Sequence, residues 1–353
     1  MSIFVKKNIN QNGHNRTKYI ITKIEKNLSI LVFAIKVLIK IDKKYGIFLL
    51  KFFFKQKMKI VSPQDWMNKH SHVKRILHEI FDSYLSSMKD LPIYPIQSDD
   101  NSNQESPYDD SIWIYWDNPN YIPDIVKCCI TSVRKNSTNK RIIIVNEQNY
   151  SNYIRVNPNI LRKYKEGILS KTHFSDIVRI SLLEKYGGIY MDATILQTQR
   201  TPNYVTSTDF FTFKLKIEKP WEVVSNGEWC VFFISCKKQN LLMKATLSMM
   251  NSYWEKYDLL IDYLWMDYFW KIASEKIPSI KKMLSDVPYT NPYILSLKDF
   301  DIKCSNIEYI DKISHDDTAY YKMSFKGVRN IPYKDIDGNT RLLGRIIENN
   351  RID

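Results

Sequence analysis

The middle of the chain alternates short apolar runs with segments of helical periodicity. Apolar runs at 112–116, 141–145 and 189–191 predict buried β-strands, while the spacing of apolar side chains predicts helices at 123–135 and from 174 to 186. Alternation of strand, helix and strand is typical of an α/β fold with a largely parallel sheet. We therefore expect one α/β domain with a mostly parallel central sheet, preceded by a helical N-terminal region.

The same patterns divide the rest of the chain. Strands are predicted at 209–217 and 230–234, and helices at 63–89, 240–256 and 259–275. A polar, turn-rich stretch beginning at Gln97 interrupts these patterns before the first strand. The predicted parts are an N-terminal arm at 1–60, a helical extension at 61–96, a polar linker at 97–110, the α/β domain at 111–340 and a C-terminal tail at 341–353.

Basic charge is concentrated in the arm. The whole chain has a net charge of +14, and residues 1–60 hold thirteen lysines and one arginine against only Glu25 and Asp42. The other 293 residues are therefore close to neutral. A protein that binds nucleic acid would be expected to spread basic charge over its binding face, so we expect no nucleic-acid partner.

The arm also carries many bulky apolar residues. On a helix, six lysines of the arm fall within about a third of a turn, with aliphatic and aromatic residues opposite them; these are Lys36, Lys40, Lys43, Lys44, Lys51 and Lys55. Lysines interrupt every apolar run before it reaches the ~18 residues of a membrane-spanning helix. This pattern favours a helix that lies on an anionic membrane surface through residues 28–59, with Gly46 as a possible break. The alternative is a basic helical hairpin packed on the catalytic domain.

Composition excludes several other classes. Five cysteines without a Cys-x-x-Cys spacing indicate reduced, buried thiols rather than disulfides or a zinc site. Neither a G-x-G-x-x-G sequence after the first strand nor a P-loop is present. A dinucleotide-binding fold and a P-loop ATPase are therefore not supported.

The stretch from Phe174 to Thr194 carries the most chemical information. Asp176 and Arg179 stand three residues apart and share one face of the predicted helix. Gly187 and Gly188 end that helix, and the short run after them delivers Asp192 to the carboxyl end of a strand. Two acids and a fork-shaped cation can grip a polyhydroxylated or phosphorylated ligand, although a surface ion pair and a capping Asp would give the same spacing.

These residues also carry a family resemblance. Ser175-Asp-x-x-Arg179 followed by Tyr186-Gly-Gly-x-Tyr-x-Asp-Ala-Thr194 resembles the bacterial capsular polysaccharide synthesis glycosyltransferases. That family is in turn similar to sugar-transferring toxins and yeast-type mannosyltransferases. The resemblance extends more weakly from about Ile112 to Lys326, and it implies a GT-A-like domain that binds a nucleotide-sugar.

The resemblance implies roles for particular residues. Asp176 and Arg179 would bind sugar hydroxyls, with Arg179 also near phosphate, and Asp192 would serve the ribose, the sugar or a metal. The remaining implied donor-binding residues come from the motif, the end of the first strand and a late lysine element; they are Trp116, Ser175, Gly188, Tyr190, Lys322 and Ser324. On the acceptor side the implied residues are Asp262 and Asp267, although solvated acids on an aromatic helix are the simpler interpretation.

The chain departs from the toxins and mannosyltransferases at the residues expected to hold a metal. The toxins and mannosyltransferases have Asp-x-Asp, whereas this chain has Asp192-Ala-Thr194. Mn²⁺ and Mg²⁺ favour carboxylate and phosphate oxygens, and a threonine hydroxyl is a weaker ligand. We expect Mn²⁺ or Mg²⁺ at Asp192 with the donor diphosphate, unless lysines partly replace it.

The expected function is glycosyl transfer with retention from a nucleotide-sugar, expected to be a UDP-sugar. The expected acceptor is a lipid-linked capsular or exopolysaccharide intermediate, and the expected location is the cytoplasmic face of the cell membrane. A catalytically silent sugar-nucleotide-binding or scaffold protein of the same assembly system is the alternative.

Overall fold

The computed structural model describes residues 25, 27–94, 110–291, 293–298, 305, 318–328 and 331–350. They fall into two compact units. The first holds the described residues up to Glu79 together with Tyr257–Trp265, and the second holds Ile80–Lys256 and the described residues from Met266 onward. The extension predicted at 61–96 is therefore divided between the units, and the predicted linker lies almost entirely outside the described residues.

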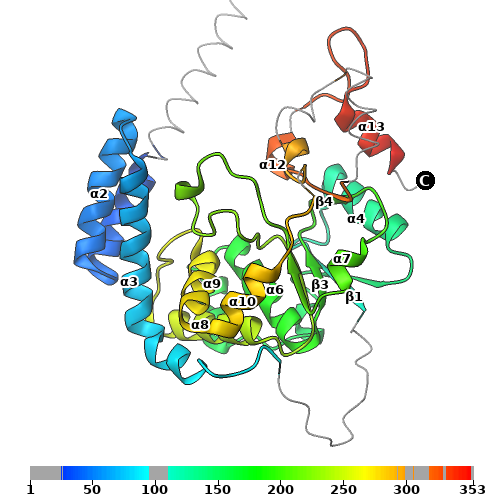
Figure 1. The fold of residues 1–353 in the computed structure, drawn as a ribbon. Coiled ribbons are helices and arrows are strands. Elements are labelled where there is room, and N and C mark those ends of the chain that lie inside the picture. Colours follow the sequence, from blue (N-terminus) through cyan, green and yellow to red (C-terminus); the bar gives the residue numbers. More distant parts are fainter. Residues whose placement is uncertain are drawn as a thin grey trace, which may run out of the picture. The chain divides into compact units, whose positions relative to one another are not determined.

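The second unit is built on a five-stranded sheet (Figure 1). Its strands are β1 (Ser111–Tyr115), β2 (Arg141–Val145), β3 (Gly188–Met191), β5 (Phe210–Thr212) and β6 (Phe233–Cys236), in the order β2-β1-β3-β6-β5. β1 is parallel to β2 and β3, whereas β6 is antiparallel to β3 and β5. Four of the five strands thus run the same way, which confirms the predicted α/β fold with a mostly parallel sheet.

The connections between the parallel strands locate the ligand-binding edge. α4 (Asp124–Asn136) joins β1 to β2, and α5 (Pro158–Lys165) and α6 (Lys171–Tyr186) join β2 to β3. Because β2 and β3 flank β1 on opposite sides, the chain changes its winding direction between β1 and β3. In open α/β sheets, ligands bind beyond the carboxyl ends of the strands at such a switch point.

The packing of Trp113 explains the register of β1 against β3. Trp113 is fully buried, its ring stacks on Tyr186 at 5.4 Å, and its Nε1 donates to the Gly187 carbonyl at 2.9 Å. The indole thus fills the core and also satisfies a carbonyl at the end of α6. The packing of Trp113 therefore fixes the residue at which β3 begins and the position at which β3 ends at the edge of the sheet.

A second, two-stranded sheet joins distant parts of the sequence. β4 (Ile195–Gln197) pairs antiparallel with β7 (Tyr320–Lys322), with Ile195 opposite Lys322. The Met323 amide extends the pairing by donating to the Thr194 carbonyl at 2.8 Å. The late lysine element is thereby carried to the residues that follow β3.

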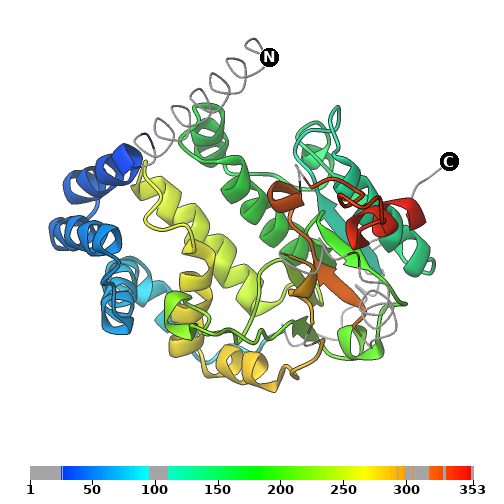
Figure 2. The same cartoon turned by 90° about the horizontal axis from the view of Figure 1, so that it is seen from above.

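The remaining helices surround this framework (Figure 2). They are α7 (Asn203–Thr206), α8 (Leu241–Lys256), α9 (Trp265–Lys276), α10 (Pro278–Asp286), α12 (Phe325–Val328) and α13 (Leu342–Asn349), with 3-10 turns at Tyr150–Asn152, Pro220–Glu222 and Ser296–Lys298. α6 packs on both β1 and α8.

Several elements differ from the sequence-based expectation. The strand expected at 230–234 is shifted along the chain and forms β6 at Phe233–Cys236. The strand expected at 209–217 ends at Thr212, since the Leu215 amide bonds the Gly227 carbonyl instead of β6. The helix expected at 259–275 begins only at Trp265, because Asp262 accepts from the Leu264 amide in a preceding turn and Tyr257–Trp265 belongs to the first unit. The expected tail instead forms α13, which packs on α4.

In the first unit, the described part of the basic arm forms a helical hairpin. A helix at 27–40 is followed by α2 (Lys43–Met58), and α3 (Pro63–Ser87) begins in this unit. The break falls at Ile41 and Asp42, where the Asp42 carboxylate caps α2 by accepting from the Tyr45 amide at 2.6 Å. Gly46 does not break the helix; it lies inside α2, where a Cβ would stand 2.3 Å from Leu38.

The side of α2 opposite its lysines packs within this unit. Phe52 meets the Trp66 ring at 5.0 Å and Phe48 meets His72 at 4.9 Å, both from α3. Tyr45, Leu49, Phe52 and Phe53 are buried. The described helices include none with a long enough apolar stretch to cross a bilayer.

The four cysteines in the described part of the chain behave as the sequence indicates. Cys128, Cys129, Cys230 and Cys236 are free and buried, and burial raises the pKa of each thiol. Cys304 lies outside the described residues.

The start of β3 depends on a glycine. Gly188 has φ +87°, and a Cβ there would stand 2.5 Å from the Ser111 carbonyl of β1. Gly338 has nearly the same φ, +85°, but open space around it. We expect Gly188→Ala to lower the free energy of unfolding by about 2 kcal/mol or more, through backbone strain plus the clash, and Gly338→Ala by about 1 kcal/mol, through strain alone. Urea unfolding followed by tryptophan fluorescence measures both, and equal losses would contradict a role for the Ser111 contact.

Candidate active site

Asp192 is the centre of the candidate site. It follows β3 directly, and its amide donates to the Phe232 carbonyl at 2.9 Å, which fixes it at the carboxyl end of the strand. One carboxylate oxygen accepts from Arg179 at 2.9 Å and the other accepts from Lys322 at 2.8 Å. The side chain remains 26% exposed. Asp192 is thus held from two sides yet can still reach a ligand.

Arg179 joins the two acids predicted from the motif. From α6, one terminal nitrogen donates to Asp176 at 3.0 Å and the other donates to Asp192. Its side chain is only 5% exposed, and the guanidinium lies over the Tyr190 ring, 4.6 Å from the centroid. Its buried Nε has no hydrogen-bond partner within the described part of the chain. The structure therefore brings Asp176, Arg179 and Asp192 together, as the sequence predicts.

Lys322 closes the network from β7. Its Nζ donates to Asp192 and, at 2.6 Å, to the Thr194 hydroxyl, and it lies 5.5 Å from the centroid of the Phe232 ring. The pairing of β7 with β4 sets this position. Four charged side chains thereby form one partly buried chain, from Asp176 through Arg179 and Asp192 to Lys322.

The charges in this chain stabilise one another. Burial by itself would raise the pKa of the Asp192 carboxyl, but the nearby charges of Lys322 and Arg179 hold the pKa below its ordinary value. Burial opposes the charge of Arg179, yet the groups around it, Tyr190, Asp192 and Asp176, raise its pKa. Asp192 is therefore ionised and Arg179 is protonated throughout the physiological range.

Trp116 lies at the same edge of the sheet. Trp113 of β1 pairs with Tyr190 of β3. When this register is continued toward the carboxyl edge of the sheet, the end of β1 lies beside Asp192. Trp116 is half-buried; its Nε1 donates to the Tyr121 carbonyl at 2.9 Å, and its ring meets Phe325 edge-on at 5.7 Å. An aromatic side chain in this place can stack on a nucleobase.

Sequence reasoning missed a second group of charges at this edge. Lys171 lies 2.7 Å from Asp117, which follows β1, and 3.5 Å from Glu147, which follows β2. The sequence does contain an indication of this group, because both acids come within two residues of the end of a predicted strand. Phe232 was missed as well, because nothing in its sequence context indicates that it lies beneath Lys322.

The other residues expected to bind the donor lie away from the carboxyl edge of the sheet or beneath the charged network. Tyr190 is buried beneath Arg179, so it positions the guanidinium. Gly188 stands at the amino end of β3, opposite the edge where Asp192 lies. The Ser175 hydroxyl donates to the Thr172 carbonyl one turn earlier in α6. Ser324 comes two residues after Lys322, directly before α12.

The two acids expected on the acceptor side have protein partners. Asp267, in the first turn of α9, accepts from the Trp229 indole at 2.9 Å. Asp262 belongs to the first unit, where its carboxylate pairs with Lys69 at 2.5 Å. Contact of either residue with an acceptor stays a prediction.

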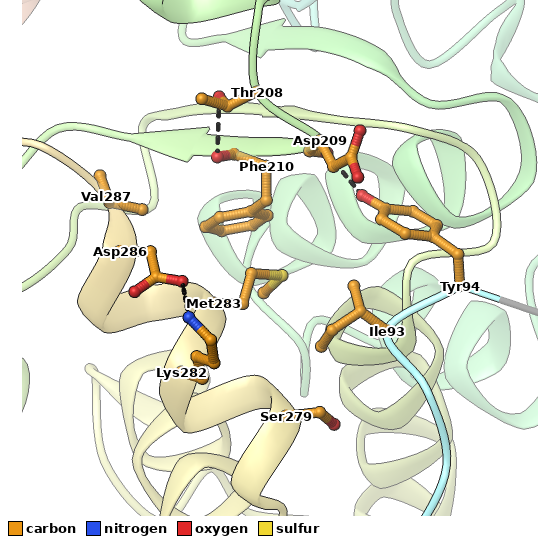
Figure 3. Close-up of a pocket in the computed structure, with 10 residues that line it drawn as sticks. All are labelled: Ile93, Tyr94, Thr208, Asp209, Phe210, Ser279, Lys282, Met283, Asp286 and Val287. Atoms are coloured by element: carbon orange, nitrogen blue, oxygen red, sulfur yellow. Dashed lines mark hydrogen bonds and ion pairs between the residues drawn. The ribbon is translucent and has the colours of Figure 1, made fainter.

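A cavity of about 350 Å³ lies elsewhere in the second unit (Figure 3). It is bordered by Phe210 of the edge strand β5, by Met283 of α10 and by the segment Ile93–Tyr94. Figure 3 shows Tyr94 bonded to the Asp209 backbone and Lys282 paired with Asp286 at its rim. None of its lining residues belongs to the network around Asp192.

Comparison with known proteins gives a match to a family model and similarities to solved structures. The family model described as "Capsular polysaccharide synthesis protein" matches residues 55–335, a range that contains the whole Asp192 network. No curated protein matches the chain. Among solved structures, one named "PaToxG Glycosyltransferase" is similar at 16% sequence identity and a TM-score of 0.37, covering 62% of this chain and 83% of that one.

The family match confirms the family that the Ser175–Thr194 motif resembles, and with it the expectation of an enzyme. The chain belongs to the capsular polysaccharide synthesis protein family.

Proposed function

We propose that the protein transfers a sugar, with retention, from a UDP-sugar to a lipid-linked capsular polysaccharide intermediate, using a GT-A-like site at the carboxyl edge of β1 and β3. The observation that carries this proposal is the charged network of Asp176, Arg179, Asp192 and Lys322 at the switch point of the sheet. Such a position suits a phosphate-containing ligand. Trp116, at the end of the neighbouring strand, would stack on the uracil.

The network suits the charge changes of glycosyl transfer. When the donor C1–O bond breaks, its electron pair passes to the diphosphate, and C1 gains positive character. Asp192 would orient the sugar through its hydroxyls, while Arg179 holds that carboxylate in one position. Lys322 would stabilise negative charge on the departing diphosphate.

Retention is supported by the state of the acids. Asp176 and Asp192 are both paired with cations, which lowers their nucleophilicity. A front-face transfer fits better than a covalent intermediate. In that transfer the acceptor oxygen bonds to C1 from the side that the diphosphate leaves, and the hydroxyl proton passes to the departing diphosphate oxygen.

The Asp192 carboxylate gives the first test. Asp192→Asn keeps the size of the side chain but removes the charge that faces the sugar and C1. We expect sugar transfer or donor hydrolysis to fall by about 100-fold or more, while circular dichroism shows an unchanged fold.

Asp286→Asn is the matched control, because Asp286 sits in an exposed pair with Lys282 on α10, away from the network. It should keep full turnover. Equal turnover in the Asp192→Asn variant and the wild-type protein would contradict the site. A wild-type protein that binds the donor without turnover would favour the catalytically silent alternative.

The first unit supports association with an anionic membrane surface. The helix at 27–40 exposes an apolar row with a spacing of three or four residues, which is one helix face; the row consists of Leu28, Val32, Ile35 and Ile39. Lys36 and Lys40 are exposed beside it. α2 likewise exposes Ile47, Phe54 and Met58 among Lys43, Lys44 and Lys51.

The exposed apolar residues are not the ones that a single continuous helix would present to a membrane. Such a helix would present the apolar side opposite its lysines, but that side of α2 is buried. The exposed row can enter the interface while lysines contact lipid phosphates. Each lysine near such a surface contributes about 1 kcal/mol. A lipid-linked acceptor would then lie in the same membrane as the enzyme.

Ile35→Glu combined with Ile39→Glu tests this surface. We expect at least about a tenfold loss of binding to phosphatidylglycerol vesicles, because two inserted side chains are replaced by charges that the lipid repels. Ile336→Glu is the control, since Ile336 is 98% exposed but lies in the second unit.

Co-sedimentation with phosphatidylglycerol vesicles and with phosphatidylcholine vesicles is the measurement. Wild-type binding should fall with salt and be weak on phosphatidylcholine. If the double variant sediments with the vesicles as fully as the wild-type protein, this apolar row does not bind lipid. The same result is expected if another part of the chain covers the row.

A further inference from the structure

Lys322 places a fixed cation between the first and third residues of the Asp192-Ala-Thr194 sequence. Its Nζ lies 2.8 Å from an Asp192 carboxylate oxygen and 2.6 Å from the Thr194 hydroxyl. Both sides of this contact are held by backbone, since β4 pairs with β7 and the Met323 amide bonds the Thr194 carbonyl. The lysine side chain is 18% exposed. The ammonium is therefore set in place by the fold.

The same residues fit a divalent cation poorly. Each carboxylate oxygen of Asp192 already accepts from a cationic side chain, and the Thr194 hydroxyl accepts from Lys322. Within the described ranges, no group of three or more His, Cys, Asp or Glu residues comes close enough to hold a metal ion. Mn²⁺ and Mg²⁺ need several oxygen ligands, preferably charged ones. A metal ion bound here would lie against Arg179 and Lys322 and would have to displace the ammonium.

We propose that the Lys322 ammonium takes the place of the divalent cation of Asp-x-Asp enzymes, so that the donor diphosphate binds without metal. This inference rests on the proposed nucleotide-sugar donor. An ammonium has three N–H donors, and the contacts with Asp192 and Thr194 use two of them. The third can donate to a phosphate oxygen.

The geometry also explains the threonine. In an Asp-x-Asp sequence two carboxylates share a doubly charged metal ion, whereas a single ammonium carries one charge. Asp192 balances that charge, and a second carboxylate at position 194 would compete with the diphosphate for Lys322. A neutral hydroxyl at Thr194 orients the ammonium without neutralising it. Thr194 and Lys322 thus form one matched pair, which replaces the metal and its second carboxylate.

Binding of UDP and of GDP to the full-length protein, measured by calorimetry in EDTA and again in Mn²⁺, tests this inference. We expect the Kd of the preferred nucleotide to differ by less than about twofold between the two conditions. Lys322→Ala should weaken binding by about tenfold or more in both conditions, because a charge-assisted bond to phosphate is lost. Lys282→Ala, an exposed lysine of α10, is the control and should not change the Kd.

A reciprocal variant sharpens the test. Lys322→Ala combined with Thr194→Asp removes the ammonium and restores Asp-x-Asp, so nucleotide binding should recover in Mn²⁺ but not in EDTA. Wild-type binding that requires Mn²⁺ would overturn the inference and leave the proposed donor intact. If neither UDP nor GDP binds in EDTA or in Mn²⁺, that result would instead overturn the proposed nucleotide-sugar function itself.

Discussion

The ion pairs of Asp192 with Arg179 and Lys322 are the constraint on which the site depends. A buried charge is costly unless it is paired, so each of these groups requires the others. They come from α6, from the end of β3 and from β7, and Lys322 lies 130 positions after Asp192 in the sequence. Correct pairing is therefore possible only when the central sheet, α6 and the small β4–β7 sheet are all in place.

This arrangement favours position over stability. Buried ion pairs contribute little net stability compared with apolar packing, but loss of one partner leaves an uncompensated charge. Here Arg179 is also enclosed by the Tyr190 ring, and Lys322 lies near Phe232, so both cations are oriented by aromatic side chains. The result is a carboxylate and an ammonium presented in fixed geometry at a sheet edge. Preorganised charge of this kind is what glycosyl transfer requires.

The basic arm shows how one helical hairpin can use two apolar faces. The side opposite the α2 lysines, including Tyr45, Phe52 and Phe53, is consumed by packing within the first unit. A different row, from Leu28 to Ile39, stays exposed beside lysines. The periodicity of the sequence cannot show which of these two faces is buried, because both consist of the same residue types. Only the turn at Asp42 decides which face packs inside the unit.

The sequence by itself determined the α/β architecture, the strands around Trp113 and Ile143, and the grouping of Asp176, Arg179 and Asp192. These follow from local periodicity and from a helix, a Gly-Gly break and a strand within 21 residues, so short-range geometry suffices. The family was recognisable from the same stretch. The contact of Lys322 with Thr194 was decided only by the tertiary structure, because antiparallel pairing of β4 with β7 joins segments whose separation no local pattern encodes. For the same reason the course of Tyr257–Trp265 and the packing of α13 could not be read from periodicity: long-range contacts, rather than the propensity of each segment, choose the partner.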